Sequence, residues 1–419
     1  MARNKKNANR VKKTALMCLL CGILLITSTY AWFIGMQSVT VSQFDVTIAA
    51  AEGLALSMDG VKWFTDEALS AHTETAYTGN TNTWATDGLI PMSSVGDTSI
   101  SDSEMILFEK GSLTATKGGY RLLASRVNYP TTSDDITKGK GYVAFDLFIR
   151  NKSGEEYYAT NDVANEEAIY LTTDSKVQVG STGVANTGIE NSVRVGFVQI
   201  GRVEQDGAVA SVVTSIDCDG DTANKVTGIC RTATIWEPND TAHVQNALNW
   251  YDKSCKERTG NTVADGSYNA EGACKTLSLT SAYTTYAVAN ELEVGSNVDV
   301  YDGADYNKYT ANYVDAATYF GEGYTKSSAK LVGMDYFTDT EKAKKGVDRP
   351  TFMTLAPNSI TKVRVYVWIE GQDIDNYDFA QLGQAITVNF GFTKEKFTGA
   401  DVGYDKTNTA TLPEDVQGN

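Results

Sequence analysis

A group of carboxylates near the end of the chain has the residue types and spacing of a cation site. Glu370, Asp373, Asp375 and Asp378 lie within WIEGQDIDNYD, directly after a strongly alternating stretch. Carboxylates this close must be solvated, paired or bridged by a cation such as calcium, which takes six to eight oxygen ligands. A complete calcium loop would place Asp or Asn and then Gly where Tyr377 and Asp378 stand. We therefore favour a solvated turn, with calcium binding as the alternative.

A second acidic stretch, DCDGD, starts in the same way. It contains Asp217, Asp219 and Asp221, but Gly228 stands where a calcium loop would place its closing Glu. A solvated loop is again favoured over a calcium site. A glycosidase pair could be chosen from either cluster, but acids within one loop do not establish the separation between two carboxyls that such catalysis requires.

Histidine offers no catalytic arrangement. The chain has two histidines, His72 and His243, and each lies alone in a polar stretch. Zinc binding and histidine-activated nucleophiles both require Cys, Asp or Ser partners at suitable spacing, and the sequence shows none. We therefore expect surface histidines, no catalytic residues, no metal and no cofactor, and we predict that the protein is not an enzyme.

The cysteines beyond the N-terminal leader are even in number: Cys218, Cys230, Cys255 and Cys274. Outside the cell they could form two disulfides, in one of three connectivities. Strand-like residues on both sides of a turn-rich loop would allow Cys218 and Cys230 to close a hairpin, and free thiols are the alternative. Cys18 and Cys21 lie in an apolar leader, so their C-x-x-C spacing is not a redox motif.

Aromatic side chains could form platforms for sugars or for adhesion. The candidates are Trp63, Trp84, Trp236, Trp250 and Trp368, with Tyr301, Tyr306, Tyr309 and Tyr313 in a Tyr-rich stretch. Most large aromatic residues of a β-sandwich lie in or near its core, so core packing is the favoured interpretation. Trp368 is the best platform candidate, because it shares the polar-facing side of its strand with Arg364 and Tyr366.

Apolar residues that alternate with period two dominate the chain and predict the elements that position these side chains. Strands are predicted at residues 141–150, 168–171, 176–179, 192–203, 209–216, 231–236, 361–369 and 385–392. Helical patterns are few, and the clearest covers residues 241–253 after a cap at Asn239-Asp240. Short alternating strands with few helices between them predict a mainly β protein, an antiparallel β-sandwich.

A long irregular insertion is predicted to divide this sandwich. Residues 1–31 form an apolar leader helix, either a signal peptide or a membrane anchor. The sandwich then occupies residues 32–252 and 347–398, with a polar surface insertion at 253–346 and a polar tail at 399–419. Insertions of this length are usually functional or disordered.

The leader has the order of a secretory signal. Its basic start carries no acid and is followed by the apolar residues 15–26; the cations are Arg3, Lys5, Lys6, Arg10, Lys12 and Lys13. Cleavage between Ala31 and Trp32, after the small-x-small sequence TYA, is favoured over an uncleaved anchor with aromatic residues at the membrane surface. In either case the rest of the chain is outside the cell, secreted or at the cell surface.

A strand-like segment, VTVSQFDVTI, follows the leader closely, and its alternation changes phase near Ser42-Gln43. Residues 44–48 are predicted to belong to the protein's own sandwich, with donation to a neighbouring molecule as the alternative. For residues 32–41, which signal removal would free, both interpretations stay open. A strand that adds to an open sheet edge on the next subunit makes a head-to-tail contact, and such contacts build filaments.

The residues around the cleavage site carry a resemblance. TYAWF at residues 29–33, a short strand and then GLALS at residues 53–57 resemble the TasA/camelysin class of Gram-positive surface proteins. The resemblance implies processing at a T-x-A site before an aromatic residue, a jelly-roll-like β-sandwich, and assembly into fibres of the biofilm matrix. RVGFV, IWEPN and VRVYVWIEGQDID are similar to segments of large surface proteins of the same bacteria, which implies the same location and no activity.

The net negative charge of the chain argues against nucleic acid as a partner. The chain has a formal net charge of −16, and loss of the basic leader makes the exported part more acidic. An acidic surface does not bind phosphate backbones, so nucleic acid is not expected. We expect a structural protein that associates with itself or with other surface and matrix proteins, and with the membrane if the leader is uncleaved. The alternative is a membrane-anchored adhesin that binds glycan or a host surface through its insertion.

Overall fold

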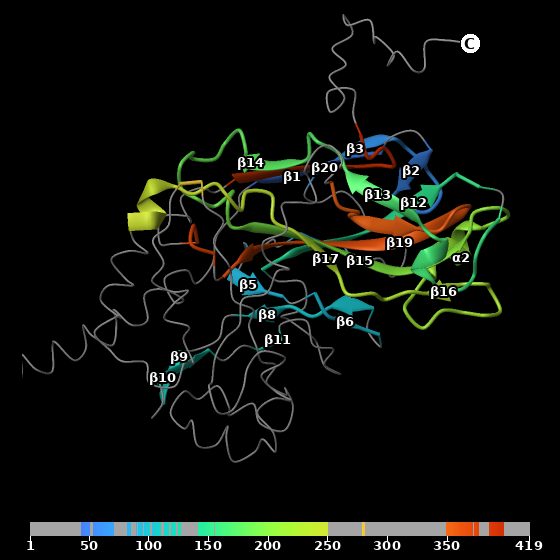
Figure 1. The fold of residues 1–419 in the computed structure, drawn as a ribbon, viewed down its shortest axis with the longest axis horizontal. Coiled ribbons are helices and arrows are strands. Elements are labelled where there is room, and N and C mark those ends of the chain that lie inside the picture. The colour runs from blue at the N-terminus through green and yellow to red at the C-terminus, as the bar shows by residue number, and fades with distance from the viewer. Residues whose placement is uncertain are drawn as a thin grey trace, which may run out of the picture.

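Three long strands form the centre of the larger sheet of a two-sheet β-sandwich (Figure 1). β19 (Ser359–Glu370) pairs antiparallel with β12 (Val143–Asn151) along one edge and with β15 (Val193–Glu204) along the other. Branched and aromatic side chains favour these strands because they pack well on a pleated surface. The strands predicted at 141–150, 192–203 and 361–369 are confirmed.

The computed structural model describes most of the sandwich. It covers residues 43–50, 53–70, 82–84, 89, 91–94, 96–100, 103–109, 113–116, 119–122, 125–126, 141–154, 156–249, 279–280, 349–371, 373–376 and 385–397. The predicted leader, the Ala31–Trp32 cleavage site, the tail and nearly all of the insertion lie outside these residues. Within them, no helix is both long enough and apolar enough to cross a bilayer.

Shorter strands complete the larger sheet. β2 (Leu54–Ser57) and β4 (Asn82–Trp84) pair with β12, while β16 (Thr227–Gly228) and β17 (Thr234–Trp236) pair with β15. β5 (Pro91–Ser93), β8 (Phe108–Glu109) and β11 (Ser125–Arg126) continue the sheet from the end of β19. Two further antiparallel pairs are β6 (Thr98–Ser99) with β7 (Glu104–Met105), and β9 (Leu113–Thr116) with β10 (Gly119–Leu122).

The smaller sheet contains the first and the last strand of the described chain. Its order is β18 (Met353–Leu355), β13 (Glu167–Leu171), β20 (Ala385–Thr393), β1 (Gln43–Ala50) and β3 (Asp66–Ser70), with β14 (Lys176–Val179) also on β20. β1 runs parallel to β20, from Gln43 opposite Ala385 to Ala50 opposite Phe392. Most other pairs are antiparallel, so the predicted antiparallel β-sandwich is confirmed, and this parallel pair is an addition to it.

The main apolar core lies between the two sheets, where the inward positions of every long strand meet. The inward faces predicted by alternation are confirmed: Val143, Phe145, Leu147 and Ile149; Val193, Val195 and Phe197; Val363, Val365, Val367 and Ile369; Ile386, Val388, Phe390 and Phe392. Phe197 is central, with edge-to-face contacts to Phe352 at 4.8 Å and Phe390 at 5.1 Å between ring centroids. Such contacts add to the stabilisation from burial alone.

The opposite face of the larger sheet was expected to be polar and exposed, and that expectation is wrong. Tyr366 and Trp368 are buried in a second apolar core, which β7, α2 and the loop after α2 cover. Arg364 Nε lies 2.7 Å from Asp146 Oδ1, and Lys362 Nζ lies 3.5 Å from Asp146 Oδ2. Arg364 also donates to the carbonyl of Ser103 at 2.6 Å, and thus ties the covering layer to the sheet. β19 is therefore buried on both faces.

The strand predicted at 209–216 is also wrong, because these residues form a short helix. α2 (Ala210–Thr214) buries Val213 against the second core and leaves Val209 exposed. Apolar residues in VASVVTSI fit a strand and a short helix equally well, and only the covering position of this segment decides between them. Of the helix predicted at residues 241–253, residues 245–249 are helical, whereas residues 241–244 are not, so the predicted start after Asn239-Asp240 is wrong; residues 250–253 lie outside the described residues.

The side chain of Asn239 donates a hydrogen bond to a backbone carbonyl at the outer edge of β14. The amide of Gly180 donates to the carbonyl of Ala385, so alternate residues of β14 bond to β20 and the carbonyl of Val177 points away from it. Asn239 Nδ2 donates to that carbonyl at 3.2 Å and to the carbonyl of Glu190 at 3.0 Å. This edge of the smaller sheet is therefore tied to the segment that follows β17.

Candidate functional site

Three strand termini meet at one end of the larger sheet and bring the predicted acidic residues together. The start of β15 lies beside the end of β19, with Arg194 opposite Trp368, and the end of β17 lies beside Val195. The turn after β19 then folds back over these ends. We name the resulting group the buried acidic cluster; its members are Arg194, Glu237, His243, Glu370, Asp373 and Asp375.

Arg194 is the centre of this cluster. Its Nη2 atom lies 2.6 Å from Glu237 Oε1 and 2.6 Å from Asp373 Oδ2, and its side chain is 0% exposed. Its Nη1 atom donates to the carbonyls of Asn191 and Val193. A guanidinium that bonds several carboxylate and carbonyl oxygens in this way can satisfy charges that burial would otherwise make very costly.

His243 joins the cluster from the segment before the helix at 245–249. Its Nδ1 atom lies 2.7 Å from Asp375 Oδ2, and the amide of Val244 donates to Asp375 Oδ1 at 2.9 Å. The His243 side chain is 4% exposed, so the expectation of a surface histidine is wrong for this residue. His72 lies outside the described residues.

Glu370 completes the cluster at the last position of β19. The hydroxyl of Ser93 donates to Glu370 Oε1, and Trp368 Nε1 donates to Glu370 Oε2 at 3.4 Å. Glu370, Asp373 and Asp375 are all buried, so the favoured interpretation as a solvated turn is wrong for these three residues; Asp378 lies outside the described residues. The pairing that carboxylates at this spacing require comes from Arg194 and His243.

The cluster has more acidic than basic side chains, and the pKa of two of its carboxyl groups is raised. Burial raises the pKa of Glu237 well above its usual value; Arg194 opposes this rise, while Asp373, Asp240 and Glu370 add to it. Burial also raises the pKa of Asp375 to about 6, and the contact with His243 limits this rise. The cluster can therefore hold protons near neutral pH. In the part of the chain that is described, no three His, Cys, Asp or Glu side chains are grouped to hold a metal ion.

The raised pKa of Asp375 predicts a pH-dependent stability. A carboxyl whose pKa is higher in the folded protein binds its proton more tightly there, so its stabilising contribution is present at low pH and lost as the pH rises from 3.8 through about 6. Asp375→Asn should flatten the dependence of the unfolding free energy on pH in this window, by on the order of 2–3 kcal/mol. Urea unfolding at a series of pH values measures it.

Exposed Asp219→Asn is the control for that measurement, and its pH dependence should match that of the parent protein. Other carboxyls titrate in the same window in both variants, so only the difference between Asp375→Asn and the parent reports on the cluster. Parallel curves for these two proteins would contradict the assignment.

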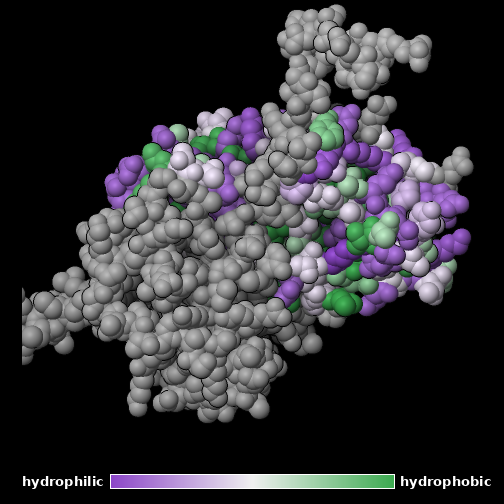
Figure 2. Space-filling view, in the orientation of Figure 1, coloured by the Kyte–Doolittle hydropathy of each residue, from purple (hydrophilic) through white to green (hydrophobic). Residues whose placement is uncertain are grey.

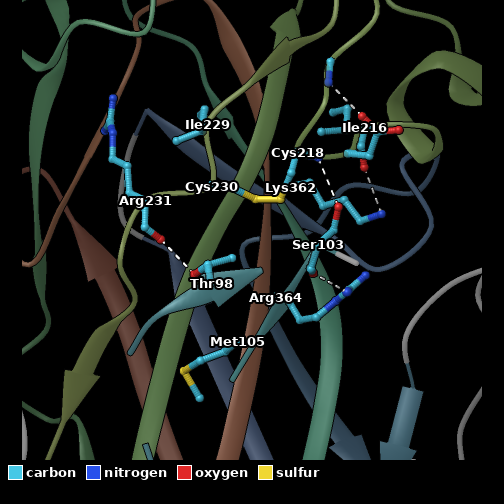
Figure 3. Close-up of a disulfide and its surroundings, with 12 residues drawn as sticks. Thr98, Ser103, Met105, Ile216, Cys218, Ile229, Cys230, Arg231, Lys362 and Arg364 are labelled. Atoms are coloured by element: carbon cyan, nitrogen blue, oxygen red, sulfur yellow. Dashed lines mark hydrogen bonds between the residues drawn. A yellow bond between two sulfur atoms is a disulfide. The ribbon is translucent and has the colours of Figure 1, made fainter. Parts of the chain in front are cut away.

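The second acidic stretch lies in an exposed loop closed by a disulfide (Figure 3). Cys218 and Cys230 are linked, with a Cα–Cα distance of 5.3 Å, which confirms this pair; Cys255 and Cys274 lie outside the described residues. Asp217 and Asp221 accept backbone amides of their own loop, from Gly220 and Ala223. These acids shape the turn, while the disulfide holds the loop over the second core.

Removal of the disulfide should destabilise the protein. Its two cysteines are 12 positions apart, and a loop of this length is worth roughly 3 kcal/mol on the chain-entropy estimate. The double variant Cys218→Ser, Cys230→Ser should lose about this much in urea unfolding. Peptide mapping without reductant should show the two cysteines linked in the parent, and a double variant as stable as the parent would contradict the prediction.

Core packing, the favoured interpretation of the large aromatic residues, is confirmed for the tryptophans whose side chains are described. Trp236 and Trp368 are both 0% exposed, and Trp63 is partly buried with Arg150 stacked 3.7 Å from its ring centroid. The side chains of Trp84 and Trp250, and the four tyrosines of the insertion, are not among the described ones. Figure 2 shows a described surface of mostly hydrophilic residues with small apolar areas between them.

Sequence reasoning missed three members of this site. Arg194 and Glu237 were assigned no role, and His243 was assigned to the surface. One signal was available, because an arginine between valines in a strand of the sheet centre requires an acidic partner if the second face is covered.

Comparison of the chain with protein-family models, with curated proteins and with solved structures found no match. The class that the fold and the site define is a two-sheet β-sandwich whose larger sheet carries a buried acidic cluster at one end. These comparisons assign the chain to no family.

Proposed function

We propose that this protein is an exported structural component of a Gram-positive cell surface that assembles into extracellular fibres. The observation that carries the proposal is the junction of a secretory leader with a strand: only residues 32–38 separate the predicted cleavage site after Ala31 from the strand-like segment VTVSQFDVTI. A leader of this kind delivers the body outside the cell, and cleavage before Trp32 would leave a free strand-like segment at its new N-terminus.

The body is consistent with that location. Disulfides form and persist in oxidising surroundings outside the cell, and Cys218–Cys230 is such a bond. The large excess of acidic residues suits a soluble extracellular body. Arg194, Asp373, Asp375 and Glu370 of the buried acidic cluster bond to one another or to neighbouring groups of the fold, which supports a structural role for them and a non-catalytic role for the protein.

The strand behind the leader has two parts with different roles in this proposal. Residues 44–48 belong to β1, which pairs with β20 and β3 of its own chain, as the favoured interpretation predicts. The segment 32–41 lies outside the described residues, and we assign to it the donated strand. Addition to an open sheet edge of the next molecule would use backbone hydrogen bonds for affinity and alternate side chains for specificity.

The alternative function, a membrane-anchored adhesin for glycan or a host surface, has lost its best aromatic candidate. Trp368 is buried and cannot stack on a sugar without unfolding of its surroundings. The insertion at 253–346 remains the segment through which such binding would occur. We therefore rank the adhesin second.

Electron microscopy of the exported chain tests the proposal. Protein that begins at Trp32 should form fibres at high concentration, whereas a control that begins at Ser42 should stay dispersed, because it lacks the donated segment but keeps β1. Mass spectrometry of the native protein should find Trp32 as its first residue. Dispersed molecules from the Trp32 form, or an intact leader on the native protein, would overturn fibre assembly by this route.

A further inference from the structure

The first and last strands of the described sandwich lie side by side and run in the same direction. β1 pairs with β20 along all 8 of its residues, from Gln43–Ala385 at one end to Ala50–Phe392 at the other. The remaining described strands lie between these two in the sequence. The chain therefore enters and leaves the body through one parallel ladder.

This arrangement determines how a pulling force reaches the body. The chain enters β1 at Gln43, beside the start of β20, and leaves β20 at Thr393, beside the end of β1. Tension on the two chain ends thus pulls the two strands past each other along their length. All residue pairs of the ladder resist at once, whereas a force applied to one end of a ladder opens its pairs one by one.

We propose that the β1–β20 ladder is a mechanical clamp and that the body functions as a load-bearing link. Tension that enters at Gln43 passes directly into β20 and out at Thr393. The insertion and the loops between β1 and β20 in sequence bear no tension until the ladder fails. The inference goes beyond the proposed function, because it concerns a single body and holds whether or not bodies join into fibres.

The packing around the ladder favours strength. Val46 and Ile48 of β1 and Val388 of β20 are buried in the main core, so one side of the ladder is shielded from water that would compete for its hydrogen bonds. β3 pairs with the other edge of β1, and β14 with the other edge of β20. Both clamp strands are thus interior strands of the sheet, and neither can peel away at a free edge.

Single-molecule force spectroscopy in two pulling geometries tests the clamp. In the first, handles are attached to the two ends of the chain that begins at Trp32. In the second, the N-terminal handle is moved to an azide-bearing residue that replaces exposed Lys62, near Thr65, whose carbonyl accepts the amide of Ala50. Position 62 and Thr393 are at the same end of the small sheet, so this pull should open β3 and β20 from that end.

The unfolding force should be several-fold higher in the first geometry than in the second. Forced unfolding reports the unfolding barrier along the pulled direction, so a difference between two geometries in one protein cannot come from overall stability. Equal forces, or a weaker response when the chain ends are pulled, would overturn the clamp. Failure of fibre assembly would leave this result unaffected.

Two matched valine variants locate the resistance within the sheet. Val46 in β1 and Val177 in β14 are both buried and both pair with Val388, from its two sides. The two alanine variants should have similar Tm values. Val46→Ala should nevertheless lower the end-to-end unfolding force, whereas Val177→Ala should leave this force near the parent value. Equal reductions in the two variants would show that the force reports general stability and would overturn the assignment to β1.

Discussion

Replacement of Arg194 by methionine is expected to lower the free energy of unfolding by about 3–5 kcal/mol, the usual cost of removing one partner from a buried ion pair. The guanidinium lies 2.6 Å from carboxylate oxygens of both Glu237 and Asp373, and its side chain is fully buried. Without it, buried carboxylates repel one another with no compensating charge. Urea unfolding at neutral pH measures the loss.

The matched control is Lys394→Met, which removes a cation from an exposed pair. Lys394 lies 3.0 Å from Glu167, but both side chains are partly in water, so the loss should be below about 1 kcal/mol. Adding Glu237→Gln to Arg194→Met should recover part of the lost stability, because one of the uncompensated acids is then removed. An Arg194→Met protein as stable as the Lys394→Met protein would show that the cluster does not depend on this cation.

Trp368→Ala is expected to cost about 3–5 kcal/mol, because it opens a large cavity in the second core. The indole is fully buried, and its ring lies so close to Gly196 that a Cβ there would be 3.1 Å from it. Its Nε1 atom also donates to Glu370, so the substitution removes a donor from the buried acidic cluster. Thermal and urea unfolding both measure the effect.

Phe397→Ala provides the comparison for Trp368→Ala. Phe397 is 46% exposed, and its truncation should change stability by no more than about 0.5 kcal/mol. Any glycan binding lost in Trp368→Ala would therefore follow from unfolding and would not identify a sugar platform. A Trp368→Ala protein whose free energy of unfolding is within about 1 kcal/mol of the parent value would contradict the burial of this residue.

Much of the sandwich could be predicted from alternation alone. β12, β15, β19 and β20 have their inward faces where the pattern places Val, Ile and Phe, because one buried face of a strand imposes a period of two. The Cys218–Cys230 pair could also be predicted, since both cysteines flank a turn-rich segment of a chain whose leader predicts export.

The second core could not be predicted in the same way. In β19, Lys362 and Arg364 alternate with valines, a pattern that is typical of a strand with one face in water. Here these charges are buried because Asp146 pairs with them and a separate layer covers them. Neither the ion pairs nor the cover leaves a local signal, since their members are far apart in the sequence.

The candidate site could be predicted only in part, again because its members are far apart in the sequence. Asp373 and Asp375 were found as a carboxylate group, but their environment was assigned to solvent. Their partners Arg194 and His243 come from distant segments, and only the pairing of β15 with β19 brings them near. A sequence pattern can identify acids that need compensation, whereas the source of that compensation is a property of the topology.

Asn239 has a consequence for molecules that meet at high concentration. Its side-chain amide occupies the outward carbonyl of Val177, which a newly arriving strand would need as an acceptor. A foreign peptide could lengthen the small sheet at β14 only after displacing that amide. Random extension of the small sheet is therefore disfavoured at this edge, and the fibre growth proposed above would have to use another part of the molecule.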